Sequence, residues 1–223
     1  MVEEQKIPET MNSIVLVSKG EVDFAQIPVP KPEAHQLLVK IECATLNPSD
    51  MLFLKAATGM RPKEYPFTPG WEGAGVVVQA GSDNDYAKSL IGKRVAVMRG
   101  NDAVPGVMTT GGIYADYAVC DTMKVVPLPE HISNEEGASF FVNPMTAIGM
   151  VRRSKELGAS SIIMNAACSQ LCRMIIKLCQ REEYNITPIC VVRRQEQVDI
   201  LKDMGVKNIV NSSAEDYEAQ MTQ

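Results

Sequence analysis

The sequence predicts an α/β protein whose first part, residues 1–130, is rich in β-strands and whose second part, residues 131–223, alternates strands with helices. Two observations carry this prediction. Short apolar runs in the first part are separated by Gly and Pro turn residues, which is typical of a small barrel or sandwich. In the second part, continuous apolar runs alternate with segments of helical periodicity, which indicates a parallel sheet.

The first part contains five apolar runs that predict strands. They cover residues 13–17, 37–43, 75–80, 94–98 and 113–120. Gly20, the prolines at 28, 30 and 32, and the sequence Gly81-Ser82-Asp83-Asn84 supply turn residues between them. These strands are short and regularly interrupted, so we expect a compact β domain.

The second part opens with a capping box, Ser133 followed by Glu136, in which each side chain satisfies a free backbone donor of the first helical turn. The helix is expected to pause at Asn143-Pro144 and to resume until Gly158 ends it. The β-α-β pattern that follows is expected as a strand over 161–165, a helix over 171–178, a strand over 189–192, a helix around 198–201 ended by Gly205, and a short strand at 209–210.

Composition limits the function classes. The chain has 223 residues, 45% hydrophobic, and a net charge of -5 with a pI of about 5.2, which argues against nucleic acid or an anionic membrane as the main partner. No apolar run reaches the roughly 20 residues that cross a bilayer. The six cysteines lack zinc-site spacing and fit a reducing intracellular compartment, with the mitochondrial matrix and the cytoplasm both open. The N-terminal residues resemble neither a signal peptide nor a transit peptide.

The turn after the 161–165 strand is the first candidate site. In a dinucleotide-binding fold this turn holds the pyrophosphate against a helix N-terminus, and it favours small residues. Here it runs from Ala166 to Cys172 without any glycine, and it includes Ser169 and Gln170. The pattern alone fits a generic α/β crossover without a ligand equally well.

A second candidate is the pair Arg193-Arg194 at the end of the next predicted strand. In such folds an acidic residue here prefers NAD, whereas arginine suits the 2′-phosphate of NADP. The pair therefore indicates NADP if a dinucleotide binds; a solvated, charged strand end is the alternative. Asn47-Pro48-Ser49-Asp50 and Pro69-Gly70-Trp71-Glu72-Gly73 form a third cluster, which is either the edge of a site or a pair of turns.

Taken in order, these segments resemble the medium-chain dehydrogenase/reductase superfamily over roughly residues 12–217. The matching stretches are Leu38–Ile41 with Asn47–Asp50, Pro69–Val77, Gly92–Val95, Gly111–Val119, Phe140–Ala147 and Asn165–Arg194. The resemblance implies a GroES-like catalytic domain, a barrel, followed by a partial Rossmann domain. It also implies an active site in the cleft between them.

The resemblance further implies a branch, a cofactor and site residues. Zinc-containing members carry Cys, His and Cys where this chain has Asn47, Trp71 and Val142, and no cysteine lies between Val97 and Ala115, so we expect no zinc at either family site. The zinc-free branch reduces enoyl thioesters or quinones with NADPH. The stretch Asn165–Arg194 resembles mitochondrial-type 2-enoyl thioester reductases most, and quinone oxidoreductases almost as much. The implied cofactor contacts are Asn143, Ala166, Ser169, Gln170, Cys172, Arg193 and Arg194, and Asn47 and Asp50 are expected to line the side that takes the small-molecule substrate.

Three departures from the family pattern bear on activity. Cys172 and Gln170 replace common glycines, and Thr58 stands where the reductases carry a tyrosine that donates to the substrate carbonyl. The chain also stops inside the nucleotide-binding domain, so another protein chain is expected to cover the incomplete sheet near Ile209 and Val210. Two hypotheses therefore stay open, an NADPH-dependent reductase and a non-catalytic subunit of a larger complex. A third possibility is that the chain is a fragment of a longer protein.

Overall fold

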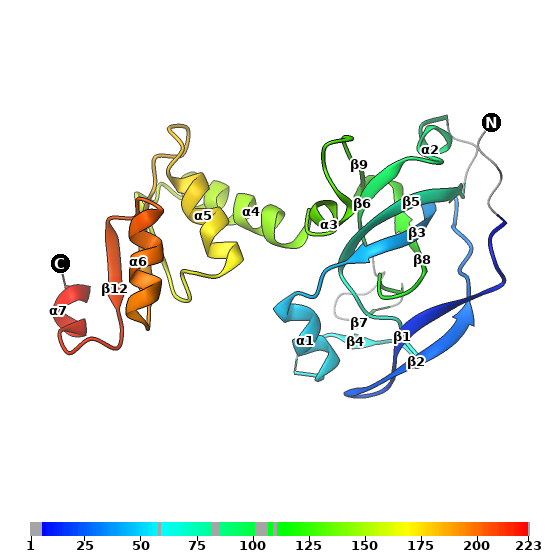
Figure 1. The fold of residues 1–223 in the computed structure, drawn as a ribbon, viewed down its shortest axis with the longest axis horizontal. Helices are drawn as coiled ribbons and strands as arrows, with labels where there is room; N and C mark the ends of the chain where they lie inside the picture. The colour runs from blue at the N-terminus through cyan, green and yellow to red at the C-terminus, as the bar shows by residue number, and fades with distance from the viewer. Residues whose placement is uncertain (1–5, 58, 82–84, 101–106, 109–110, 223) are drawn as a thin grey trace. The chain divides into compact units, whose positions relative to one another are not determined.

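The computed structural model describes residues 6–57, 59–81, 85–100, 107–108 and 111–222. The backbone divides into two compact units, Met1–Val142 and Asn143–Gln223, and each is described by itself. The first is β-rich and the second alternates strands and helices, which confirms the predicted fold class (Figure 1). Among the described residues, no helix combines the length and the apolar character needed to span a bilayer.

The first unit is built on a five-stranded antiparallel sheet in the order β8-β3-β5-β6-β9. The hairpin β1-β2 and the short parallel pair β4-β7 lie outside this sheet. The strands are β1 (Thr10–Ser18), β2 (Glu21–Pro28), β3 (Gln36–Ala44), β4 (Arg61–Pro62), β5 (Glu72–Ala80), β6 (Arg94–Met98), β7 (Val107–Met108), β8 (Tyr117–Asp121) and β9 (Val125–Pro127).

Short helices connect these strands: α1 (Pro48–Leu54), α2 (Asp85–Ser89), the 3₁₀ helix η1 (Thr122–Lys124), α3 (Asn134–Gly137) and the start of α4 (Val142–Glu156). The core of the sheet consists of fully buried aliphatic side chains such as Leu37, Val39 and Val95. Gly75 permits the close pairing of β5 with β3, because a Cβ there would lie 2.0 Å from the carbonyl oxygen of Lys40.

The second unit is a three-stranded parallel sheet in the order β10-β11-β12. Its elements are β10 (Ser161–Met164), α5 (Gln170–Cys179), β11 (Thr187–Val192), α6 (Gln195–Asp203), β12 (Asn208–Asn211) and α7 (Tyr217–Met221). The buried face of α5, including Ile175 and Ile176, packs with Leu201 of α6 and Cys190 of β11 in one core. Figure 1 shows α5 and α6 running beside the sheet as ribbons from yellow to orange.

Two sequence-based predictions of elements needed correction. The strand expected over 113–120 begins only at Tyr117, because Gly112 and Ile113 form a turn that bonds to Thr68 and Gly70. The helical pause falls at 138–141, and Pro144 lies in the first turn of α4, where a missing N–H costs nothing.

Strand β2 was not predicted at all. Its residues are mostly exposed on both faces, so the alternation that signals a half-buried strand is absent.

The capping box was confirmed: the Ser133 hydroxyl accepts from the Glu136 N–H at 3.2 Å, and the Glu136 carboxylate accepts from the Ser133 N–H at 3.0 Å.

Candidate functional site

The first group of candidate residues surrounds the N-terminus of α1. Asn47 is the residue before the helix, Pro48 opens it, and Asp50 accepts a hydrogen bond from the Asn47 N–H at 2.8 Å. Both polar side chains are almost fully buried, Asn47 at 5% exposure and Asp50 at 1%. Burial raises the pKa of Asp50 against the opposing effect of its hydrogen bonds.

Glu72 lies at the centre of this buried group. It is 1% exposed, and one carboxylate oxygen accepts from the Asn47 side-chain amide at 3.1 Å. The other accepts from the backbone N–H groups of Phe141 at 2.7 Å and Val142 at 2.9 Å. These donors open helix α4, so the carboxylate satisfies its free N–H groups and complements its positive end. The sequence pattern placed Glu72 in a cluster that was either the edge of a site or a turn, and it assigned Glu72 no role.

Tyr114 completes the same network. Its hydroxyl donates to the carbonyl oxygen of Thr45 at 2.8 Å, and the Thr45 hydroxyl accepts from the Asn47 amide at 3.4 Å. Burial first, and then the negative charges of Asp50 and Glu72, raise the pKa of the Tyr114 phenol well above its ordinary value. The phenol therefore stays neutral and acts as a hydrogen-bond donor. No sequence motif pointed to this residue.

Asn47 and Asp50 lie together at the start of α1, where both form hydrogen bonds within the protein. Their contact with substrate stays a prediction, and Thr58 lies outside the described residues. Trp71 packs in an aromatic cluster, with its ring centroid 5.8 Å from that of Phe53 and 5.7 Å from the Arg99 guanidinium carbon. An indole has no lone pair suited to Zn²⁺. In the described ranges no set of three His, Cys, Asp or Glu residues is arranged to hold a metal ion.

The second group of candidates lies in the second unit, at the turn between β10 and α5. Ala166 adopts a positive φ of 48°, a conformation that usually requires glycine. Ser169 precedes the helix, and its hydroxyl accepts from the Cys172 N–H at 3.3 Å. The N–H groups of Gln170 and Leu171 have no acceptor within the described chain. Two free donors at the N-terminus of a ten-residue helix suit a phosphate group.

Cys172 occupies the position of a common family glycine without blocking the outer face of this turn. Its residue is 8% exposed, and its thiol points back to the Asn165 carbonyl oxygen at 3.6 Å. The crowding predicted for Cys172 therefore falls on the contact between helix and strand, whereas Gln170 is exposed. Asn143 is half-buried in the first turn of α4, and its predicted cofactor contact stays a prediction.

Arg193 and Arg194 line a polar hollow of about 510 Å³ together with Gln197 and Ser213. The carboxamide oxygen of Gln197 accepts from the backbone N–H groups of both arginines, each at 3.2 Å. This bond fixes the backbone where β11 ends and α6 begins. The hollow places two guanidinium groups beside neutral polar side chains, an arrangement suited to a phosphate.

The two units together define a class of protein. A β-rich unit precedes a parallel β-α-β unit, an order of elements that is typical of two-domain nicotinamide-dependent oxidoreductases. The predicted groove that would join the Asn47 group to the Ala166 turn stays a prediction.

Comparisons with known proteins agree with this class. Residues 33–130 match the alcohol dehydrogenase GroES-like domain. The chain is 29% identical over 195 residues to a chloroplastic quinone-oxidoreductase homolog of Spinacia oleracea, covering 83% of this chain and 55% of the relative. It is 29% identical to a mitochondrial enoyl-[acyl-carrier-protein] reductase of Xenopus tropicalis, covering 82% and 49%. A crystal structure of a Mesorhizobium loti protein, provisionally described as an NADPH:quinone reductase, matches with a TM-score of 0.81 and 36% identity, covering 97% and 64%.

These matches support the expected medium-chain dehydrogenase/reductase superfamily: the chain is similar to quinone oxidoreductases over most of its length. It spans about half the length of the curated relatives that it matches.

Proposed function

We propose that this chain supplies substrate-side and cofactor-side units of an NADPH-dependent reductase of α,β-unsaturated carbonyls, either enoyl thioesters or quinones. One observation carries the cofactor assignment. The Arg193-Arg194 hollow lies where β11 ends, in the same unit as the turn whose Gln170 and Leu171 N–H groups lack acceptors. A phosphate-bearing dinucleotide uses both features.

NADPH, when bound, supplies the hydride. The residues of this chain supply binding and polarity. The N–H groups of Gln170 and Leu171 suit the pyrophosphate, and the arginine pair suits a 2′-phosphate. In the first unit, Tyr114 is a neutral donor within a buried network that contains two carboxylates, Asp50 and Glu72. Its single O–H proton is donated to the Thr45 carbonyl oxygen, so polarising a substrate carbonyl would require the hydroxyl to turn from Thr45 to the substrate.

The names of the relatives support the substrate class. They include quinone oxidoreductases and an enoyl-[acyl-carrier-protein] reductase, whose substrates share a carbonyl conjugated to a double bond. The relatives include chloroplastic and mitochondrial proteins, so their names do not select one compartment. All six cysteines are free thiols, which supports a reducing compartment.

The cofactor assignment is tested by titrating the protein with NADPH and NADH and following nicotinamide fluorescence. We expect NADPH to bind more tightly. We expect the double variant Arg193→Gln/Arg194→Gln to lose about tenfold to hundredfold in NADPH affinity while NADH binding stays within twofold, roughly the value of charge-assisted hydrogen bonds. Lys202→Gln, an exposed charge change on α6, is the matched control. Equal effects on both nucleotides would remove the 2′-phosphate assignment.

A second candidate function, a non-catalytic subunit, is favoured by one observation. The turn from Ala166 to Cys172 contains no glycine, although Ala166 adopts a glycine-like φ of 48° and a phosphate turn favours small residues. A folded protein that binds neither nucleotide at millimolar concentration would favour this alternative.

A further inference from the structure

A hollow of about 310 Å³ lies in the first unit. It is bounded by the β1-β2 turn, the C-terminal end of α1 and strand β4. Its lining includes Leu16, Lys19, Phe53, Met60, Arg61 and Tyr65. Neither Asn47, Asp50 nor Tyr114 lines it.

The floor of the hollow is rigid and apolar. Leu16 and Phe53 are 2% and 4% exposed. The Phe53 ring packs edge-on against Phe67, with centroids 6.1 Å apart, and 5.8 Å from the Trp71 ring. Because these rings fix one another, the floor keeps its shape without a ligand.

The walls leave apolar side chains in contact with water. Met60 is 37% exposed and Tyr65 43% exposed. Neither belongs to the buried cluster below, which contains Leu16, Phe53 and Trp71. Covering the two side chains would remove apolar area from water, which favours an occupant with an apolar body.

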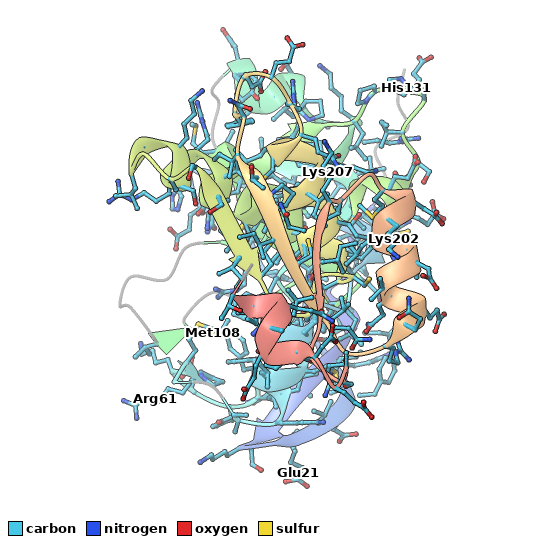
Figure 2. All side chains as sticks on the ribbon, turned by 90° about the vertical axis from the view of Figure 1, so that its left-hand side faces the viewer. Glu21, Arg61, Met108, His131, Lys202 and Lys207 are labelled. Carbon is cyan, nitrogen blue, oxygen red and sulfur yellow. The ribbon has the colours of Figure 1, made fainter. Side chains whose placement is uncertain are left out.

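The rim is cationic. Lys19 and Arg61 are exposed, no acidic residue lines the hollow, and neither cation forms an ion pair among the described residues. The nearest acidic residue in sequence to Lys19 is Glu21, whose carboxylate accepts from the Ser18 hydroxyl at 2.9 Å. Figure 2 shows Arg61 and Glu21 extending into solvent well apart.

We propose that this hollow binds a small amphipathic anion, a medium-length aliphatic chain that ends in one carboxylate or phosphate. The chain lies on Leu16 and Phe53, and the head group meets Lys19 and Arg61. The volume is at the lower end of the range for ligand sites, which suits a molecule of this size. The lining residues Ala56 and Gly59 flank Thr58 in the sequence, so the test uses no nucleotide and measures binding separately from reductase activity.

The chain contains its own reporter. Trp71 is the single tryptophan, and its ring touches the Phe53 ring that forms the floor. Titration with decanoate, decyl phosphate and uncharged decanol is therefore followed by tryptophan fluorescence. We expect saturable binding of at least one anion, about tenfold tighter than decanol, and the better anion identifies the head group.

Two variants locate the binding. The double variant Lys19→Gln/Arg61→Gln should lower the affinity for the anion about tenfold, which is about the factor by which the anion binds more tightly than decanol. The affinity for decanol should not change. Its control is Lys202→Gln/Lys207→Gln, which removes the same charge from exposed lysines of the second unit (Figure 2). Gly59→Leu should fill the hollow, because a Cβ at Gly59 meets nothing within 4 Å. Gly149→Leu, also without neighbours within 4 Å, is the control for added apolar area.

The proposal is overturned if decanol binds as well as both anions, if no ligand changes the fluorescence of the folded protein, or if the control variants weaken binding as much as the rim and Gly59 variants. These outcomes leave the NADPH titration unaffected, so the two proposals fail separately.

Discussion

At the residue scale, the most testable strain is at Ala166. Its φ of 48° places an L side chain in the left-handed region, at a cost of roughly 1–2 kcal/mol. We expect Ala166→Gly to stabilise the second unit by about 1 kcal/mol in urea unfolding, after the entropy that glycine adds to the unfolded chain. If the positive φ is also the ligand-bound conformation, NADPH affinity should not fall.

The control for this prediction is the next residue. Ala167 is fully buried in the core of the second unit and has no positive φ. Ala167→Gly should therefore destabilise by about 1 kcal/mol. Destabilisation of similar size by both substitutions would contradict the strain at Ala166.

Asp50 gives a prediction about pH. Burial raises its pKa, so the folded state holds the proton more tightly than the unfolded state. The resulting stability is present below the ordinary pKa of about 4 and is lost as the pH rises through the raised value. Asp50→Asn should thus raise the melting temperature near neutral pH, and the gain should vanish in acid. A gain that persists unchanged in acid would contradict the assignment.

The sequence anticipated some of these residues for physical reasons. Asn47 and Asp50 were found as part of a polar, turn-forming cluster and through the family resemblance, and Arg193 because it ends a predicted strand. Glu72 stood in the same cluster without a role and Tyr114 was missed, because their partners, Val142 and Thr45, lie about 70 residues away along the chain. No local pattern encodes a contact of that separation.

At the scale of elements, helix α4 depends on a residue outside it. Glu72 on β5 accepts from both N–H groups at its start. Glu72→Gln should lower the free energy of unfolding by about 1–2 kcal/mol, since the amide keeps an acceptor but loses the charge that complements the helix end. Urea unfolding measures the loss. Glu64→Gln, an exposed residue of the same type, should change it by less than about 0.5 kcal/mol.

The predicted elements were most accurate where periodicity and capping agree. The helices over 170–179 and 195–203 and the three parallel strands were placed within a few residues. Errors occurred where an element lacks a buried face, as in β2. They also occurred where a residue fits two positions: Pro144 was expected to interrupt a helix, but it lies in the first turn of α4.

At the scale of the whole molecule, the exposed apolar edge of the parallel sheet lies at β10. Ile163 on this edge strand is 58% exposed. A partner was expected to cover Ile209 and Val210, but strand β12 is already largely covered within the chain. Val210 is 5% exposed, and the Gln220 side chain of α7 accepts from the Asn211 N–H at 3.0 Å. The described residues therefore leave more apolar surface uncovered at β10 than at β12.

Ile163→Lys should reduce concentration-dependent self-association, measured by sedimentation velocity, because a charge on an edge strand opposes pairing between chains. Met123→Lys, which changes a 92% exposed residue of the first unit, is the control for net charge. Equal effects of both variants would show that repulsion between whole molecules is responsible.

The Gln197 carboxamide holds the two arginines of the second unit by their backbone, and it carries no charge of its own. Guanidinium groups keep their proton throughout the range in which proteins stay folded. The Gln197 anchor has no proton to gain or lose in this range. We expect the affinity for NADPH, measured from mildly acidic to neutral pH, to follow the second ionisation of the 2′-phosphate of the nucleotide, near pH 6. The pH dependence of binding would then come from the ligand.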